Sequence, residues 1–215
     1  MNFREKRASE FYYSKIELMD RLKDFETVLE RYVSYKEWVD SGLFFNPEGL
    51  HGPAHIQRVM MLSIILSQLH ELNEEEERIL IFCSLYHDIG RNHDGVDPFH
   101  GAASANKLRQ LEKKMDLAGS EEINIASLII KHHSVEDSYA INEHKKLRNH
   151  WSSGALSQLQ LLFPLFKDAD NLDRVRINDL DERYLRNDES IRLSSLAMEM
   201  YHFHRHQPDL TYFFR

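Results

Sequence analysis

The feature that most constrains the fold of this chain is a pair of ionisable residues at the end of an apolar segment. The run ILIFCSLY, residues 79–86, is followed at once by His87 and Asp88. An uncompensated charge at the end of a buried helix is strongly destabilising unless a metal ion or a partner group offsets it. The rest of the chain must therefore fold so that compensating groups reach this point.

Two further segments place the same kinds of side chain at predicted helix ends. His51 and His55 lie in HGPAHIQRV, where a helix is predicted to begin, and DADNLD places Asp168, Asp170 and Asp173 after the apolar run LQLLFPLF. Imidazoles and carboxylates are ligands of zinc, iron, manganese and nickel. Two histidines four residues apart often share a helix face by chance, so that pair alone is unspecific. All three places together predict one metal centre.

The composition favours an all-α fold. Hydrophobic residues make up 42% of the 215 residues, with only 8 Gly and 5 Pro, which argues against disorder and against a turn-rich β architecture. This length fits one domain or a domain with an extension. We expect a helical extension over residues 1–45 that packs on a core domain over residues 46–215.

The helices are predicted from apolar periodicity and capping residues. From Phe3 to about Val39, apolar residues recur at three- and four-residue steps and predict one amphipathic helix or a helix pair. Residues 90–98 are predicted to form a polar loop, and residues 134–154 an indistinct polar segment that serves as a lid or an insertion. A helix is expected from Pro53, in its first turn, to about residue 72, and another from Glu74, capped by Asn73, to residue 86 or 88. Further helices are expected over 100–115, from the cap Ser120 to about 133, over 155–170 and over 189–204.

Charge and cysteine content exclude some classes of protein. The net charge is -8, and no Lys/Arg block is long enough to track a long nucleic acid. Cys83 is the single cysteine, which excludes an intrachain disulfide and suits a reducing compartment. The N-terminus lacks an apolar signal, and the longest apolar stretch is far below the roughly 20 residues of a spanning helix. We expect a cytoplasmic protein without a membrane partner, although an effector exported without a signal would look the same.

His55, the His87–Asp88 pair and Asp170, in the contexts HxxRV, HDIGR and DADNLD, resemble the signature of the HD-domain superfamily. The resemblance covers roughly residues 50–176. It implies a five-helix core, an HD-domain bundle, in which these four side chains chelate one divalent ion. It also implies hydrolysis of phosphoester or phosphoanhydride bonds, on a substrate that we expect to be a small nucleotide. The ion could be manganese, nickel, cobalt, iron, zinc or magnesium.

His100 and His132 are candidates for binding a second ion. Their positions resemble those of the binuclear branch of the superfamily, which includes cyclic-nucleotide phosphodiesterases. In that reading Asp88 bridges the two ions, and His100 and His132 bind the second one. In the alternative reading, as in mononuclear members, these histidines only contact the substrate phosphate. The sequence therefore leaves one ion or two ions open.

The expected ligands suggest a reaction. A divalent ion lowers the pKa of a water molecule and polarises a phosphoryl oxygen, so that hydroxide attacks phosphorus in line. Arg91, three residues after Asp88, is the candidate for clamping phosphate, with an exposed loop arginine as the alternative. His100, His132 or His133 could protonate the leaving group, because imidazole titrates near neutral pH.

Other side chains are expected to support the ligands. Arg58 should pair with Asp168 or Asp173 and hold two helices together, whereas His51 either reaches the site or caps a helix. The resemblance matches the metal ligand to Asp170, which leaves Asp168 and Asp173 as supporting or capping groups.

Three alternative functions stay open at this stage. The scaffold resembles that of di-iron oxygenases, and six candidate nitrogen and oxygen ligands permit iron. A weaker likeness, through GVDPFHGAASA and DADNLDRVR, is to bacterial effectors that cleave phosphoribosyl-linked ubiquitin. A non-catalytic regulator that binds a nucleotide is the third, and the apolar stripe of the N-terminal segment permits a homodimer.

Overall fold

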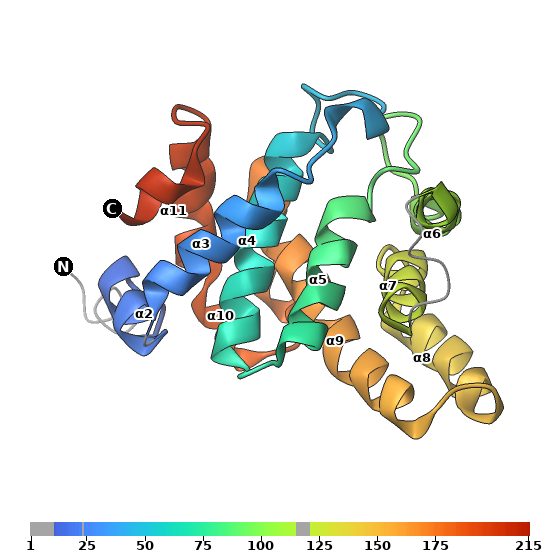
Figure 1. Cartoon of the computed structure of the whole chain (residues 1–215). Coiled ribbons are helices and arrows are strands. Elements are labelled where there is room, and N and C mark those ends of the chain that lie inside the picture. The colour runs from blue at the N-terminus through green and yellow to red at the C-terminus, as the bar shows by residue number, and fades with distance from the viewer. Residues whose placement is uncertain (1–10, 23, 115–120) are drawn as a thin grey trace.

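The computed structural model describes residues 11–22, 24–114 and 121–215, and these form helices and connecting loops without any strand (Figure 1). The predicted all-α fold is therefore confirmed. The α-helices are α2 (Lys15–Arg21), α3 (Phe25–Lys36), α4 (Pro53–Leu69), α5 (Glu74–Tyr86), α6 (His100–Lys114), α7 (Glu121–His132), α8 (Asp137–Lys146), α9 (Ser153–Leu172), α10 (Asp188–Arg192) and α11 (Ser194–His204). The 3-10 helices are η1 (Ser41–Leu43), η2 (Leu147–Asn149), η3 (Asp173–Ile177), η4 (Glu182–Tyr184) and η5 (Leu210–Phe214).

Capping residues start the helices where the sequence predicts. Pro53 occupies the first turn of α4, where its missing N–H costs no hydrogen bond. The Asn73 side chain accepts hydrogen bonds from the backbone N–H groups of Glu75 and Glu76, and the Glu76 carboxylate accepts one from the backbone N–H of Asn73. This capping box satisfies donors that the first turn of α5 leaves free. The predicted cap Ser120 and the residues before Phe11 lie outside the described residues.

The structure differs from three of the predictions about helices. The helix from Pro53 ends at Leu69 rather than residue 72, because Glu71 adopts a left-handed backbone with φ of 52°. The last predicted helix divides at Leu193 into α10 and α11. The predicted indistinct segment 134–154 contains α8, whose buried side chains are only those of Ala140 and His144. So sparse an apolar face produces no clear helical period in the sequence.

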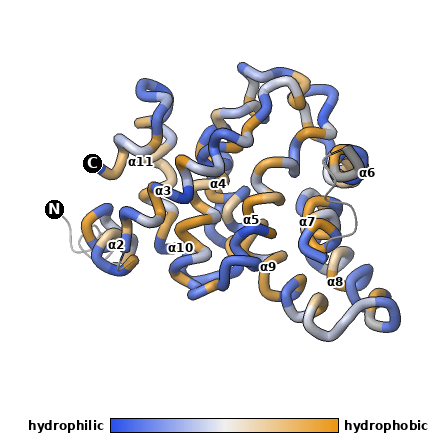
Figure 2. Tube along the Cα trace, in the orientation of Figure 1, coloured by the Kyte–Doolittle hydropathy of each residue, from blue (hydrophilic) through white to orange (hydrophobic). Residues whose placement is uncertain are grey.

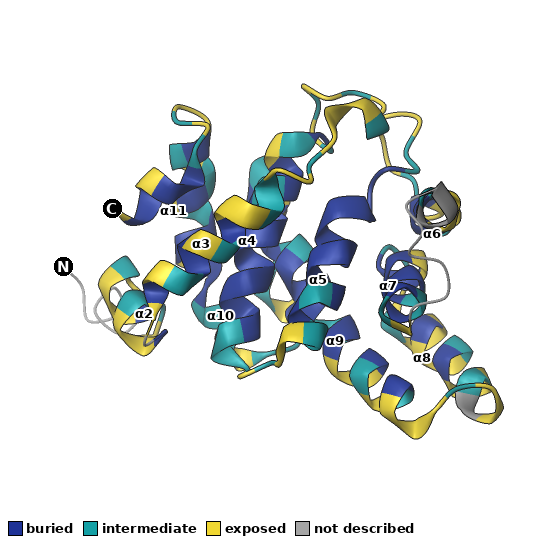
Figure 3. Ribbon diagram, viewed as in Figure 1, coloured by how far each residue is buried: buried dark blue, intermediate teal, exposed yellow. Residues whose placement is uncertain are grey.

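Helix α4 lies at the centre of the fold and packs against α3, α5, α9 and α11 (Figure 1). Its middle turns are fully buried, with Met60, Met61 and Ile64 at 0% exposure. Figure 3 shows α4 and α5 as mostly buried, whereas α6 and α8 expose one face each. Figure 2 shows hydrophobic residues recurring along α5, α7 and α9. These helices form one core whose polar ends converge on the site described below.

The helices α2 and α3 precede this core, and α3 packs along α4. Val28, Leu29 and Tyr32 make up much of the buried face of α3. The domain boundary expected near residue 45 stays a prediction. Among the described residues, no helix has the length and apolar character needed to cross a membrane.

Close packing of the loop after α5 on α6 generates the first prediction. A Cβ atom at Gly90 would lie 2.2 Å from the backbone nitrogen of Ser104 and 2.5 Å from the carbonyl carbon of Ala103. We expect Gly90→Ala to lower the free energy of unfolding by about 1–3 kcal/mol, because the backbones must separate. Gly154→Ala is the control, since its nearest neighbour would be Ser152 Oγ at 3.8 Å. Equal unfolding midpoints in urea for the two variants would contradict this interpretation.

Candidate metal centre

The four predicted primary ligands converge from three separate segments. His55 lies near the start of α4, His87 and Asp88 follow α5, and Asp170 lies in the last turn of α9. The Nε2 atoms of His55 and His87 are 3.0 Å apart. His55 Nε2 is 3.5 Å from Asp88 Oδ2 and 3.4 Å from Asp170 Oδ1, and His87 Nε2 is 3.4 Å and 3.7 Å from the same two oxygens. Ligand atoms about 2.1 Å from one ion are separated by about 3 Å or more, so this spacing suits a single divalent ion.

The electrostatics of this cluster keep both carboxylates ionised. Burial opposes ionisation of Asp88, but the neighbouring His87 and hydrogen bonds from His100 and His51 hold its pKa well below its usual value. Asp170 behaves in the same way: burial opposes ionisation, and His55 holds its pKa well below the usual value. Both carboxylates are therefore ionised at neutral pH.

His55 is held by hydrogen bonds on both sides of its ring. Burial and Arg176 disfavour its charged form, but hydrogen bonds with Asp170, Asp173 and Asp88 outweigh them and raise its pKa to about 9. A divalent ion must displace the proton of His55, so metal affinity should fall as the pH is lowered.

Asp173 orients His55 from behind. Its Oδ2 lies 2.7 Å from His55 Nδ1, so that Nδ1–H donates to Asp173 and Nε2 points at the other ligands. Arg58 donates to the same carboxylate from Nε at 2.5 Å and from Nη2 at 2.9 Å. The predicted ion pair of Arg58 with one of the two acids is thus confirmed, with Asp173 as the partner.

Asp168, which the sequence left as a supporting or a capping group, contacts backbone N–H groups just before α10 rather than the candidate ligands. Its fully buried carboxylate accepts hydrogen bonds from the backbone N–H groups of Arg186 and Asn187, at 2.9 to 3.0 Å, and from both of their side chains. It therefore holds the segment before α10 against α9. Asp168 and Asp170 are two residues apart on one helix and point to different sides of it, which separates their roles.

A second group of candidate ligand atoms lies next to the other carboxylate oxygen of Asp88, Oδ1. His100 Nε2 lies 3.1 Å from Asp88 Oδ1 and 2.8 Å from the Nε2 of His133. Burial, together with the nearby His100 and His87, lowers the pKa of His133 to about 3, so its ring is neutral. Its Nδ1–H donates to the carbonyl of Ile130 at 2.7 Å, so Nε2 carries a lone pair, and it faces His100. Asp88, His100 and His133 therefore present the donors that a second ion would need.

His133, rather than His132, faces this group. His132 Nδ1 lies 3.0 Å from His144 Nε2, and its buried Nε2 has no hydrogen-bond partner in the described part of the chain. The prediction of His132 as a ligand of a second ion therefore disagrees with its placement. Successive helical residues differ in direction by about 100°, so only one of two adjacent histidines can face the site.

Arg91 contacts the cluster directly. It donates from Nε to Asp88 Oδ1 at 2.8 Å and from Nη1 to the carbonyl of Gly95 at 3.1 Å, and its Nη2 lies 3.4 Å from His100 Nε2. Its side chain is only 10% exposed, which rules out the alternative of an exposed loop arginine. Its guanidinium lies at the edge of the cluster of candidate ligands, where the sequence predicted a group that binds phosphate.

His51 and Arg176 close the opposite side of the cluster. His51 Nδ1 lies 2.7 Å from Asp88 Oδ2 and 3.3 Å from Arg176 Nη2. Arg176 also donates to the carbonyls of Leu50 and Asp173, at 3.0 and 3.1 Å. It thus ties the start of η3 to the loop before α4. Sequence reasoning gave Arg176 no role; its position in DADNLDRVR, six residues after Asp170, was the available signal.

Groups of side chains that could hold an ion occur three times in this cluster: His51, His55 and Asp88; His55, His87 and Asp170; and His87, Asp88 and His133. Within each group the ligand atoms lie within 4.8 Å of one another. The donors are imidazole nitrogens and ionised carboxylates, most of them buried. The residues present therefore fit a divalent metal ion.

Comparison with known families agrees with this geometry. A family model described as the HD domain matches residues 54–175, more than half of the chain. The chain belongs to the HD domain family, as the sequence motifs indicated. Searches of the curated proteins and of the solved structures returned no match.

The contact between Asp173 and His55 generates a prediction about metal affinity. We expect Asp173→Asn to weaken Mn²⁺ binding by roughly 10–100-fold, because the neutral amide no longer holds His55 and leaves Arg58 without its charge partner. Asp168→Asn is the matched control, since it removes an equally buried carboxylate that contacts no ligand. Titration followed by the EPR signal of free Mn²⁺ measures both, with unfolding curves as a check on folding. Equal losses of affinity would show that the effect is general destabilisation.

Proposed function

We propose that the protein is a metal-dependent phosphohydrolase or phosphodiesterase that cleaves a phosphoester or phosphoanhydride bond of a nucleotide-like substrate. The observation that supports this most strongly is the meeting of His55, His87, Asp88 and Asp170 within 3.0 to 3.7 Å in an HD domain. A divalent ion such as manganese, nickel, cobalt, iron, zinc or magnesium, bound there, supplies a water of lowered pKa and polarises a phosphoryl oxygen.

The protein's own groups position the substrate and stabilise charge. Negative charge accumulates on the phosphoryl oxygens during in-line transfer, and cations placed beforehand stabilise it. Arg91 is such a cation, because Asp88 and the Gly95 carbonyl hold its guanidinium in place. Since these contacts also lower its mobility, Arg91 needs little rearrangement when a phosphate arrives.

His100 has one of two roles, according to the number of ions bound. With two ions, the residues that would hold the second one are His100, His133 and Asp88. With one ion, His100 Nε2 lies where it could donate a proton to the leaving oxygen, next to Asp88 and Arg91. Both roles require His133 at its present place, 2.8 Å from His100.

The substrate is proposed to be small. The net charge of -8 and the absence of a basic block from the sequence disfavour a long nucleic acid, whose binding depends on many phosphate contacts. The site offers two nearby arginines, Arg91 and Arg176, of which Arg176 is already engaged with backbone carbonyls. This number of cations suits one or two phosphate groups.

Removal and return of metal tests the proposal. Protein treated with a chelator and reloaded with Mn²⁺, Ni²⁺, Co²⁺ or Fe²⁺ should hydrolyse a member of a panel of nucleotides and cyclic nucleotides, measured as phosphate or nucleoside release. Asp88→Ala should abolish turnover, because it removes a shared ligand. Asp179→Ala is the control, since Asp179 is 61% exposed and pairs with Arg174. Full activity without metal, or oxygen consumption without hydrolysis by the iron form, would contradict the proposal.

His132, the last residue of α7, and His133, directly after it, can be compared by substituting each in turn. We expect His133→Gln to lower turnover by roughly 10–100-fold and His132→Gln to leave it near the wild-type rate, because only His133 contacts His100. Metal content per chain, measured in the same variants, separates the two roles. A loss of one ion in His133→Gln identifies a second metal site, and unchanged content identifies a substrate contact. A larger loss of turnover in His132→Gln than in His133→Gln would contradict the proposal that His133 is the histidine that acts at the site.

A further inference from the structure

A cavity lies between α8 and residues 156–164 of α9, apart from the candidate metal centre. Its volume is about 390 Å³, within the range of about 300–1,000 Å³ that small-molecule sites span. Ile141, Leu156, Phe163 and Pro164 form its apolar walls. Phe163 precedes Asp170 by seven residues on α9, so the walls stand about 10 Å along the helix from that ligand. No residue that lines the cavity belongs to the groups of candidate metal ligands.

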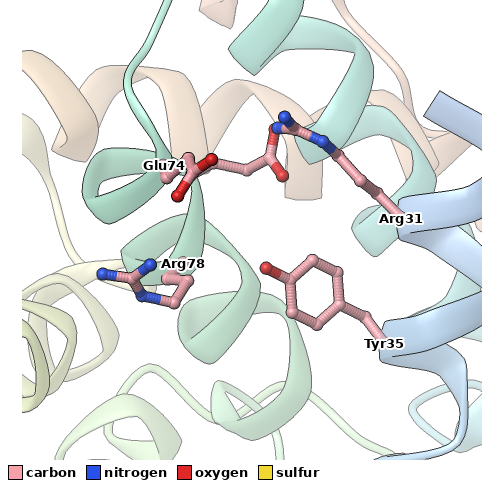
Figure 4. A pocket seen from close by; sticks show the side chains of 5 residues that line it. Arg31, Tyr35, Glu74 and Arg78 are labelled. Atoms are coloured by element: carbon pink, nitrogen blue, oxygen red, sulfur yellow. The ribbon is translucent and has the colours of Figure 1, made fainter. Parts of the chain in front are cut away.

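The other cavity of interest, of about 170 Å³ between α3 and α5, satisfies its own charges. Figure 4 shows Arg31 and Tyr35 of α3 facing Glu74 and Arg78 of α5. Arg31 pairs with Glu77 at 2.7 Å, and Arg78 pairs with Glu122 at 2.8 Å. Its cations therefore have partners within the protein, and no group there calls for a ligand.

The cavity between α8 and α9 has an excess of positive charge. Arg186 donates to Asp137 from Nε at 2.7 Å and from Nη2 at 2.9 Å, and Lys167 donates to the same carboxylate at 2.6 Å. Arg186 also pairs with Asp168 at 3.1 Å. The two acids thus balance Arg186 and Lys167. Lys145 lies at the exposed rim and forms no ion pair with any described residue. Its positive charge is therefore not balanced within the cavity.

His144 adds no charge to the floor of the cavity. It is 7% exposed, and burial lowers its pKa to about 4, so its ring is neutral at physiological pH. Its Nε2 is engaged with His132 Nδ1 at 3.0 Å. The edge of the Phe163 ring meets it at a centroid distance of 5.0 Å. The floor is therefore uncharged and largely aromatic.

A proline interrupts the helical hydrogen-bond pattern of α9 beside the cavity. Pro164 lies inside α9 and has no N–H group, so the carbonyl of Gln160, four residues earlier, lacks its usual helical donor. Both Gln160 and Pro164 border the cavity. A carbonyl of this kind is satisfied by water or by a donor group on a bound molecule.

From these features we propose that the α8–α9 cavity binds a small organic anion with a flat apolar body. The body packs between Leu156, Ile141 and Phe163, the anionic group faces Lys145, and a donor on the ligand meets the Gln160 carbonyl. Charge complementarity selects an anion, because the side chains at this cavity sum to one positive charge. The apolar walls exclude inorganic phosphate as the main ligand.

The test uses 8-anilinonaphthalene-1-sulfonate, which combines a flat apolar body, one sulfonate and one N–H group. Fluorescence titration of the full chain should show one site per molecule. Leu156→Trp and Ile141→Trp, which fill the cavity, and Lys145→Glu, which reverses the rim charge, should each weaken binding by about tenfold or more. The control is Leu161→Trp, at a 40% exposed position of α9 outside the cavity. Asp88→Ala should bind the probe as the wild type does.

A neutral probe separates charge from shape. N-phenyl-1-naphthylamine lacks the sulfonate, so it should bind the wild type and Lys145→Glu equally and lose affinity in Leu156→Trp. Unfolding curves identify any variant that fails to fold, and with two filling variants at different helices, one misfolded protein leaves the test intact. Unchanged sulfonate binding in folded Leu156→Trp and Ile141→Trp, or loss of binding in Leu161→Trp or in folded Asp88→Ala, would overturn the proposal.

Discussion

The buried ion pair of Asp173 with Arg58 is the interaction on which the arrangement of the site depends. The two side chains are 1% and 6% exposed, and they join α4 to the start of η3. Because a buried charge without a partner is strongly destabilising, each of these residues requires the other. The same carboxylate holds His55 Nδ1, so the contact that joins the two elements also orients a candidate metal ligand. Stability and ligand geometry are therefore coupled at one side chain.

Asp88 extends this coupling across the centre. Its Oδ2 meets His51, His55 and His87, whereas its Oδ1 meets Arg91 and His100. A single carboxylate thus separates a cluster of candidate ligands for one ion from a second group formed by Arg91, His100 and His133. Helix ends suit this purpose, since side chains there can converge while the apolar faces of α4, α5 and α9 form the core between them.

The two proposals concern different stretches of α9. Its C-terminal turn supplies Asp170 to the candidate metal centre, and residues 156–164 supply Leu156, Phe163 and Pro164 to the cavity beside α8. Lys167 and Asp168 lie between these regions and are engaged with Asp137 and Arg186. This network holds α8 and the segment before α10 on α9, and it accounts for two charged residues buried away from the metal ligands.

Local chemistry in the sequence was enough to predict the all-α fold, the helix starts at Asn73 and Pro53, and the four candidate ligands that the structure brings together, because capping, apolar period and motif spacing act over a few residues. The sequence could not choose His133 over His132 or Asp173 over Asp168, and it did not reveal α8. Each of those outcomes depends on how a helix is rotated about its axis or on contacts between separate segments. His100 and His133 are 33 residues apart in the sequence, and His55 and Asp173 are 118 residues apart. Only packing in three dimensions sets that rotation, so the tertiary structure alone decided which side chains complete the site.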